Sequence, residues 1–461
     1  MESPFDIAAD LDTPVSAYIK LAPFKPRFLL ESVESAERLA RYSFLGFGEG
    51  LTLEIRADRV LRNGVSQPRP NGRGEWLALM RDALAASPTL APAIDGLPFT
   101  GGLVGAAGYD VVRQFERLPP NRSTLDGLPE AVFVAPESVL VFDHLTRRVA
   151  LLHAGDEAER RALRAEVVRA LRGGIDQPAR AGGFSPAEPS FSRGPFLDAV
   201  ERAKRYIAAG DIYQIVLSER FSGRANLDPF QTYRGLRLLN PSPYMYFFEL
   251  GSLAIAGSSP EALVRLEHGR ASLRPIAGTR PRGSTGDEDL ALEKELLADP
   301  KENAEHVMLV DLARNDLGRV AQAGSVHVDP YKSIERYSHV MHMVSGVKGL
   351  LAPERDAFDL FAAAFPAGTL VGAPKVRAME LIAELEPVAR GLYGGTVGYF
   401  GTNGNMDQAI TIRTIVFDGD EYSFQAGAGI VADSVPDNEY REVLAKSAIL
   451  RKALELAEEG L

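Results

Sequence analysis

The segment GGTVGYFGTNGNMDQAITIRTIVFDGDEYSFQAGAGI, residues 394–430, contains three runs rich in β-branched and aromatic residues. Two sequences typical of tight turns, Asn403-Gly404-Asn405 and Asp418-Gly419-Asp420, separate the runs. The runs cover residues 394–401, 407–417 and 422–430. Because such short turns join neighbouring antiparallel strands, the segment predicts a three-stranded antiparallel meander.

The rest of the chain extends this pattern. Residues 138–142 and 149–153 predict one hairpin, and residues 262–266 and 271–275 predict another. Apolar residues at helical spacing predict helices, notably at 438–458. Runs of strands with helices grouped between them favour an α+β fold, with two large antiparallel β-sheets packed as a sandwich and helices on the outside.

Residues 173–194 form the clearest linker, because Gly, Pro and Ser dominate there and no apolar period persists. We therefore divide the sequence into an N-terminal lobe, residues 1–172, and a second domain, residues 195–461. We expect the two parts to interleave, so that the linker divides the sequence more cleanly than the structure.

Composition excludes several classes of protein. The chain of 461 residues has a net charge of −11, which argues against partners such as nucleic acid or an anionic membrane surface. It contains no cysteine, which excludes a disulfide framework, a thiolate metal site and a cysteine nucleophile. We find no signal-peptide pattern and no run of 18 apolar residues, so we expect a cytoplasmic protein with no membrane partner.

Two pairs of glutamates are spaced three residues apart on predicted helices: Glu302 with Glu305, and Glu439 with Glu442. Residues three apart share a helix face. If the two faces meet, the four carboxylates form a cluster that needs a cation, and all-oxygen ligation suits Mg²⁺. For a single helix, a solvated charged face is the more common explanation, and Lys446 continues the stripe of the second pair.

One isolated cation lies in the predicted meander. Strand alternation places Arg413 on the face of Ala409 and Ile415, between two apolar faces, so we expect it to be at least partly buried. A buried guanidinium needs an anion, which is either a substrate carboxylate or an internal Asp or Glu. The small residues at 427–429 would let backbone N–H groups approach an anion.

Other motifs are weaker. His339 and His342 are three apart, but no further metal-ligand motif accompanies them, so a structural role is the more common explanation. The Gly-rich segments 101–110 and 366–375 lack the spacing of a nucleotide-binding loop.

Six segments in order along the chain resemble the chorismate-utilising enzymes, and among them most closely the large subunits of anthranilate synthases. The resemblance extends from about residue 29 to the C-terminus. The segments are residues 211–218, 258–261, 275–283, 304–311, 372–375 and 427–429. The resemblance implies the sandwich fold that these synthases share.

The resemblance also implies roles for single residues. Glu305 and Glu442 match direct Mg²⁺ ligands, supported by Glu302 and Glu439, and this Mg²⁺ would hold the ring carboxylate of chorismate. His342 matches the general acid that helps expel the ring hydroxyl, and Thr369 and Glu302 also match the catalytic set. The residues that match the substrate-binding set are Thr279, Tyr393, Arg413, Gly427, Ala428, Gly429, Lys446, Gln214 and Ala277.

The implied reaction adds ammonia at ring C2 with loss of the C4 hydroxyl, and then eliminates pyruvate to give anthranilate. In this family ammonia normally comes from glutamine, and amidotransferases of the usual type need a cysteine nucleophile. The chain has none, so the resemblance implies a glutamine amidotransferase partner subunit, with free ammonia as an alternative donor.

Two positions indicate which branch of the family this is. Ala277 matches anthranilate synthases, whereas many aminodeoxychorismate synthases carry Lys there. Gln214 stands where the synthases that use water typically carry a Lys base. Aminodeoxychorismate synthase, an enzyme of the folate pathway, remains the alternative.

Two further segments resemble the tryptophan-binding segments of anthranilate synthases, which implies feedback inhibition by tryptophan. They contain the residues Glu31 and Ser32, and Asn240, Pro241, Ser242, Pro243, Tyr244 and Met245. Taken alone, the second segment is also typical of a turn that enters a strand, and aminodeoxychorismate synthases can keep a bound tryptophan structurally.

Two residues depart from the family pattern: Val371 stands where Ser or Thr is usual, and Thr411 where Ala is usual. Two hypotheses of another class are a tryptophan-binding scaffold, which predicts a degraded metal site, and a metal-storage protein, which does not explain Arg413.

Overall fold

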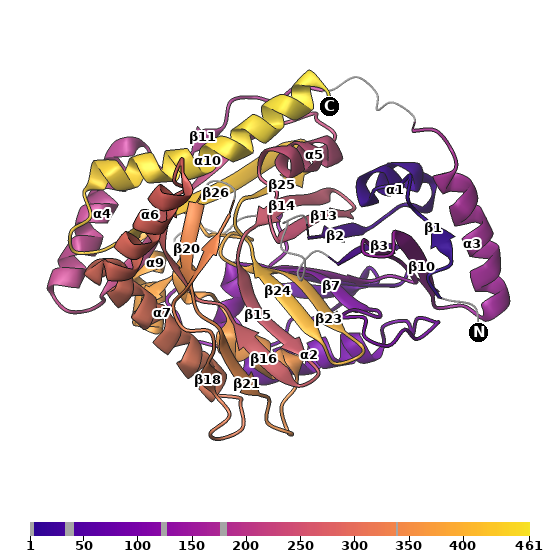
Figure 1. Cartoon of the computed structure of the whole chain (residues 1–461), viewed down its shortest axis with the longest axis horizontal. Helices are drawn as coiled ribbons and strands as arrows, with labels where there is room; N and C mark the ends of the chain where they lie inside the picture. The colour runs from indigo at the N-terminus through magenta and orange to yellow at the C-terminus, as the bar shows by residue number, and fades with distance from the viewer. Residues whose placement is uncertain (1–3, 33–40, 121–126, 176–181, 338–339) are drawn as a thin grey trace.

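The computed structural model describes residues 4–32, 41–120, 127–175, 182–337 and 340–461. The linker residues 176–181 and His339, considered above for zinc binding, lie outside these ranges. Within them, the chain is α+β with two large antiparallel sheets, as the sequence predicts, and a small third sheet at one end of the molecule (Figure 1).

The first large sheet carries the strands that end at the functional site. Among the described residues it has twelve strands, of which β22 (Gly372–Ala373) pairs with β12 beside the main path. In spatial order, the main path is β1 (Ile7–Ala8), β10 (Arg148–His153), β9 (Ser138–Asp143), β3 (Tyr42–Phe47), β2 (Phe28–Glu31), β13 (Tyr244–Leu250), β14 (Leu253–Ser259), β25 (Thr414–Asp418), β26 (Glu421–Ile430), β12 (Gln214–Arg224) and β11 (Glu188–Pro189).

The second large sheet has eleven strands among the described residues, and a three-stranded sheet stands apart from it. The second sheet runs β18 (His327–Val328), β21 (Val347–Leu350), β16 (Arg270–Leu273), β15 (Ala262–Glu267), β24 (Met406–Ile410), β23 (Thr396–Gly401), β7 (Gly102–Ala107), β8 (Ala131–Ala135), β4 (Leu51–Ile55), β5 (Arg59–Arg62) and β6 (Val65–Pro68). The small sheet runs β17 (Ile276–Pro281), β20 (Val340–Val344) and β19 (Ser333–Arg336).

Both large sheets contain strands from each side of the linker. β2 pairs with β13 and β7 pairs with β23, in antiparallel register. The expected interleaving is therefore present, and residues 1–172 contribute to both sheets.

Alternating side chains explain why the two sheets stack. On β2, Phe28 belongs to an apolar cluster formed by both sheets, whereas Leu29 belongs to the core beneath the helices. In the cluster between the sheets, the Phe99 ring lies 5.5 Å from Phe44 of the first sheet and 4.8 Å from Tyr399 of the second. A period of two along each strand produces these two apolar faces.

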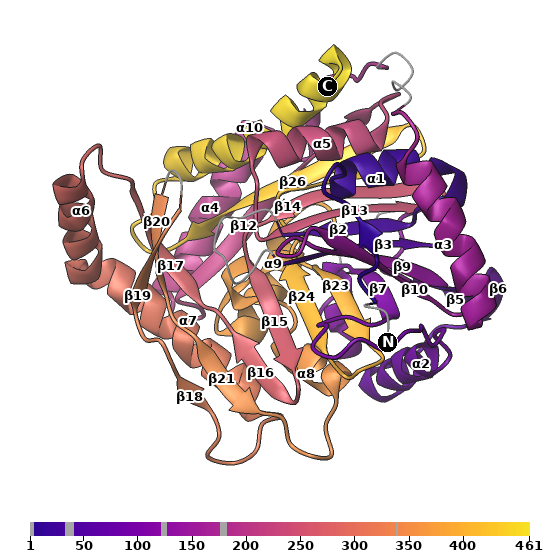
Figure 2. The same ribbon diagram turned by 45° about the vertical axis from the view of Figure 1, so that its right-hand side comes forward.

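The helices cover the outer faces. Figure 2 shows α10, α5 and α1 along one side of the first sheet, and α2 and α8 beside the second. Their bounds are α1 (Pro14–Lys20), α2 (Arg73–Ala85), α3 (Glu157–Leu171), α4 (Arg193–Ala208), α5 (Pro229–Leu239), α6 (Gly286–Ala298), α7 (Pro300–Gly318), α8 (Ala357–Ala364), α9 (Lys375–Leu385) and α10 (Pro436–Glu459), with 3₁₀ turns η1 (Ala22–Phe24), η2 (Tyr109–Gln114) and η3 (Gly368–Leu370). In the described part of the chain, no helix is both long and apolar enough to span a membrane.

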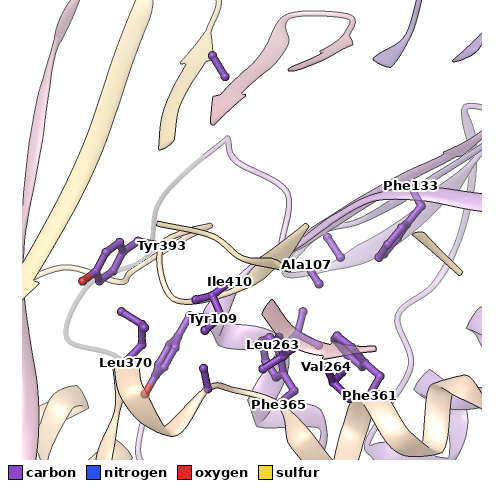
Figure 3. Close-up of a cluster of buried hydrophobic side chains, with 14 of the residues drawn as sticks. Ala107, Tyr109, Phe133, Leu263, Val264, Phe361, Phe365, Leu370, Tyr393 and Ile410 are labelled. Atoms are coloured by element: carbon purple, nitrogen blue, oxygen red, sulfur yellow. The ribbon is translucent and has the colours of Figure 1, made fainter. Parts of the chain in front are cut away.

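Helix α8 differs from the other helices beside the sheets, because every one of its residues is buried. It packs against α2, α7 and β15. Figure 3 shows Phe361 of α8, and Phe365 directly after the end of α8, close to Leu263 and Val264 of β15, in the core whose edge carries Tyr393. Leu370 and Tyr393, which also line the functional site, therefore pack against this apolar core.

One prediction about the 394–430 segment is wrong. Residues 407–417 are not a single strand: β24 lies in the second sheet and β25 in the first, and Thr411, Ile412 and Arg413 cross between them. Each half pairs with a different neighbour, β24 with β15 and β25 with β14, which forces the chain out of the extended conformation at the crossing.

Candidate functional site

A cavity of about 1010 Å³ opens where the ends of β12 and β26, the crossing at 411–413, the small sheet and helices α7 and α10 meet. Charged side chains from several elements line this cavity. Most residues predicted from the sequence line it. They are Gln214, Ala277, Thr279, Glu302, Glu305, His342, Thr369, Tyr393, Arg413, Gly427, Gly429, Glu439, Glu442 and Lys446.

Two helices bring the glutamate pairs to this cavity. The Asp299 side chain accepts hydrogen bonds from Lys301 N and Glu302 N, which begins α7 so that Glu302 and Glu305 face the cavity. Helix α10 presents Glu439 and Glu442 from the other side. The stripe predicted from the spacing is therefore present on both helices.

The carboxylates do not form a tight cluster in this structure. Among the described residues, no group of three or more His, Asp or Glu side chains is close enough to hold a metal ion. Two of the four carboxylates have cationic partners instead: Arg280 Nη1 lies 3.0 Å from Glu302 Oε1, and Lys446 Nζ lies 2.7 Å from Glu442 Oε1. The predicted four-carboxylate cluster is therefore not formed among the described residues.

The donor set nevertheless fits a hard divalent cation. Burial raises the pKa of Glu305, and neighbouring Glu302 adds to the rise. Burial likewise raises the pKa of Glu439, with a further contribution from Glu442. Carboxylates that destabilise each other in this way are stabilised by a cation between them, and oxygen-only ligands favour Mg²⁺.

Arg413 lies in the cavity, but not as predicted. It is exposed, has a positive φ of 49° and belongs to the crossing between sheets. Its Nη1 lies 3.4 Å from Asn240 Oδ1, and its carbonyl accepts a 3.1 Å hydrogen bond from Ser258 N. The prediction of burial fails because the alternation rule applies within one strand, and Arg413 lies between two.

The glycines of β26 make room for neighbouring side chains. A Cβ on Gly427 would lie 2.7 Å from the Tyr393 hydroxyl, and a Cβ on Gly429 would lie 2.9 Å from Gln214 Nε2. At Gly427 a Cβ would also lie 2.9 Å from the Leu217 carbonyl oxygen, so glycine is required there, whereas at Gly429 the flexible Gln214 side chain would have to shift. Ala428 lies between them and points into the apolar core, so only its backbone belongs to the cavity wall. Lys446 Nζ donates a 3.0 Å hydrogen bond to the Gly427 carbonyl.

His342 is held by the small sheet. On β20 it is paired in register with Thr279, and its Nδ1 lies 3.0 Å from Thr279 Oγ1 and 3.2 Å from the Gly278 carbonyl oxygen. A carbonyl oxygen can only accept, so this contact assigns a proton to Nδ1 and leaves Nε2 to exchange a proton with a ligand. Burial lowers the pKa of His342.

Two residues of the site were missed. Glu261 lines the cavity, its Oε1 accepts a 3.0 Å hydrogen bond from Thr369 Oγ1, and burial raises its pKa to about 7. Arg280 holds Glu302 and also Asp299 at 2.8 Å. A signal for Glu261 was available, because a lone carboxylate follows the apolar run 253–256 after a short Gly-Ser-Ser-Pro segment. The partner of Arg280 could not be read from sequence.

The tryptophan-related segments are adjacent. Glu31 and Met245 are paired in register on β2 and β13. Glu31 is buried and accepts hydrogen bonds from Tyr233 Oη and from Arg237 Nε at 3.2 Å. Asn240, Pro241 and Ser242 also line the large cavity, whereas Ser32, Pro243 and Tyr244 do not.

Comparison with known proteins gives three results. The family model for chorismate binding enzymes matches residues 25–452. The chain is 49% identical over 459 residues to anthranilate synthase component 1 of Thermus thermophilus, covering 98% of this chain and 97% of that relative. It is 45% identical over 475 residues to anthranilate synthase component 1 of Pseudomonas aeruginosa, covering 99% and 96%.

Solved structures agree. A crystal structure of anthranilate synthase component I from Streptococcus pneumoniae superposes with a TM-score of 0.80 at 36% identity, over 96% of this chain and 99% of that chain. The isochorismate synthase MenF of Escherichia coli superposes with a TM-score of 0.69 at 19% identity, over 95% and 91%. The second likeness concerns the fold alone.

Proposed function

The chain belongs to the family of chorismate binding enzymes, and we propose that it converts chorismate and ammonia to anthranilate and pyruvate, as the large subunit of an anthranilate synthase. The observation that carries this proposal is the one cavity that carboxylates of α7 and α10 line together with Arg413 and the glycine-lined end of β26. A dianionic substrate needs this arrangement in a protein of net charge −11, because the overall field repels it.

The two carboxylates of the substrate would bind at two ends of the cavity. We assign the enolpyruvyl carboxylate to Tyr393, Arg413 and the backbone at 427–429. Burial raises the pKa of Tyr393, so its phenol stays protonated and can donate to an anion. The ring carboxylate belongs at the glutamate end.

Mg²⁺ would be held at that end by Glu305 and Glu442, with Glu302 and Glu439 in support. When bound, the ion neutralises charge on the ring carboxylate and on the surrounding glutamates. For Glu302 and Glu442 to reach the ion, the Arg280–Glu302 and Lys446–Glu442 ion pairs would first have to separate.

The reaction needs a proton for the leaving C4 hydroxyl as ammonia bonds to C2. His342 and Glu261 are the two candidate donors. His342 has a fixed Nδ1 contact and a lowered pKa, so its imidazolium is scarce near neutral pH. Glu261 has a pKa of about 7 and keeps a substantial protonated fraction there. We therefore add Glu261 to the predicted catalytic set.

The nitrogen donor points to a second subunit. Relatives are named component 1, which implies a further component. Because the chain has no cysteine, glutamine hydrolysis of the usual kind requires a partner glutamine amidotransferase. We also propose that tryptophan inhibits the enzyme at the paired segments around Glu31 and Met245.

The deciding experiment incubates the purified chain with chorismate, Mg²⁺ and ammonium, and identifies products by fluorescence and mass spectrometry. Anthranilate with equimolar pyruvate, suppressed by tryptophan, is the expected result. Accumulation of 4-amino-4-deoxychorismate without pyruvate would show that the chain is an aminodeoxychorismate synthase, and that Ala277 does not mark the branch. No turnover, with tryptophan or Mg²⁺ still bound, would favour a scaffold or storage role.

A further inference from the structure

A buried ion pair lies directly behind the cavity wall. Glu386, after the end of α9, and Arg390 are about 4% and 3% exposed. They are joined twice: Arg390 Nη2 lies 2.6 Å from Glu386 Oε1, and Arg390 Nε lies 2.9 Å from Glu386 Oε2. Neither residue lines the cavity, and the reaction described above does not use them.

The guanidinium of Arg390 holds two backbone segments that do line the cavity. Nη1 donates a 2.7 Å hydrogen bond to the Leu370 carbonyl, next to Thr369. Nη2 donates a 2.8 Å hydrogen bond to the Val216 carbonyl, near Gln214. The guanidinium carbon also lies 5.7 Å from the ring centre of Tyr393 and 4.8 Å from that of Tyr109. Two hydrogen bonds of this guanidinium thus hold backbone carbonyls of cavity-lining residues, and its other two hold Glu386.

The carboxylate of Glu386 extends the same network to β26. Its Oε1 accepts from Ser218 N at 2.9 Å and from Ser218 Oγ at 2.8 Å. Ser218 is the register partner of Gly427, and Ser218 Oγ accepts a 2.8 Å hydrogen bond from Gln425 Nε2. Gln425 and Gly427 both line the cavity.

Stability alone does not explain such a pair. Removing two charges from water costs several kcal/mol, and a buried ion pair is often no more stabilising than apolar residues of the same volume. What a bidentate pair supplies is fixed geometry, because the planar guanidinium bonds several acceptors in set directions. Here those acceptors and rings converge on the end of the cavity assigned to the enolpyruvyl carboxylate.

We propose that Glu386 and Arg390 are positioning residues for chorismate: together they fix the Tyr393 ring, the Leu370 and Val216 carbonyls and β26 at Gly427 in the arrangement that receives the enolpyruvyl carboxylate. This inference rests on the proposed function and deepens it. It assigns to the pair an effect on binding of the carboxylate, and none on the nitrogen donor.

The first test is Arg390→Lys, which keeps the charge and loses the planar fork. The expected result is a KM for chorismate raised at least about tenfold, as loss of charge-assisted hydrogen bonds implies, with the KM for ammonium unchanged within about twofold. The matched control is Asp359→Asn, which breaks another buried carboxylate–arginine contact, to Arg81 on α2, away from the cavity. It is expected to lower the thermal midpoint without changing the KM for chorismate.

A second variant separates positioning from the cost of an unpaired charge. In Glu386→Leu with Arg390→Met both charges are removed, so no uncompensated ion remains. The proposal expects a folded protein with the KM for chorismate still raised at least about tenfold. A KM for chorismate equal to that of the parent in this double variant, or in folded Arg390→Lys, would overturn it. Failure of the parent chain itself to form anthranilate would instead refute the proposed function.

Discussion

The Thr369 hydroxyl donates a 3.0 Å hydrogen bond to Oε1 of Glu261 on the cavity wall. This contact stabilises the charged form of the carboxylate, yet burial outweighs it and the pKa of Glu261 rises to about 7. Arg413 and Lys446 also lower this pKa, without reversing the rise. The protonated fraction of Glu261, which we propose as a proton donor, is therefore set by burial on one side and by Thr369, Arg413 and Lys446 on the other.

Replacing Glu261 tests this role. In Glu261→Gln the side-chain amide can still accept from Thr369 but has no proton to give, so kcat should fall by about 10²–10⁴ while the KM for chorismate changes little. The parent kcat should also fall as pH rises through the pKa of Glu261, since the protonated form is lost, and the variant should lack that limb. Thr369→Val is the control, and it should lower kcat less than Glu261→Gln does. A kcat within about threefold of the parent would remove Glu261 from the mechanism.

The Arg280–Glu302 ion pair gives a prediction about metal binding. Arg280→Gln frees Glu302, so Mg²⁺ should bind about two- to fivefold more tightly, the scale of a partly exposed ion pair. Titration calorimetry without chorismate measures this directly. Arg282→Gln, two residues further along the same chain, removes an arginine that pairs with Asp289 and should leave the affinity unchanged. Weaker binding in Arg280→Gln would mean that Arg280 supports the site rather than competing for it.

Removal of a proposed ligand should have the opposite effect. Glu442→Gln removes one negative charge from the site and replaces a carboxylate that we assign to direct coordination. Mg²⁺ binding measured by calorimetry should therefore be lost together with turnover. Circular dichroism should show an intact fold, because Glu442 is about half exposed at the cavity. Retained Mg²⁺-dependent turnover would contradict the assignment.

Feedback inhibition can be tested at Ser32. Its hydroxyl is buried and has no hydrogen-bond partner among the residues that the structure describes. If tryptophan supplies that partner, Ser32→Ala should raise the inhibitory concentration of tryptophan about two- to tenfold, the value of one hydrogen bond. The KM for chorismate without tryptophan should be that of the parent. Unaltered inhibition would place the tryptophan site elsewhere.

Glu219 on β12 predicts a dependence of stability on pH. It is fully buried, accepts a 2.8 Å hydrogen bond from Phe191 N, and burial raises its pKa to about 7. Between the ordinary pKa of an unfolded glutamate and 7, the folded state holds the extra proton, so stability falls as pH rises, by at most about 1.4 kcal/mol per pH unit. In denaturant titrations, the free energy of unfolding of Glu219→Gln should depend less steeply on pH than that of the parent. The control Glu188→Gln, at an exposed position, should keep the pH dependence of the parent.

The sequence was sufficient where local pattern determines structure. The hairpin at 138–142 and 149–153 and the helix at 438–458 are present as β9, β10 and α10, because their periods match their burial. The stripe of Glu439, Glu442 and Lys446 reached the cavity for the same reason.

Features that depend on distant partners were not predictable in this way. Arg413 was placed within a strand because nothing local shows that β24 and β25 join different sheets. The ion pair of Glu302 with Arg280 and the hydrogen bond of Ser218 to Glu386 join residues 22 and 168 positions apart. Side-chain pattern indicates which face is buried, but it does not identify the partner.

The interleaving of strands from both sides of the linker has a consequence for how this enzyme can change over time. A regulatory half that forms its own compact body can be transplanted to another enzyme or deleted, and control is then gained or lost in one step. Here the polypeptide before the linker supplies strands to both sheets, so neither half is a transferable unit. For the tryptophan inhibition that we propose, an engineer seeking a deregulated form should therefore search residue by residue within the shared sheets rather than by truncation.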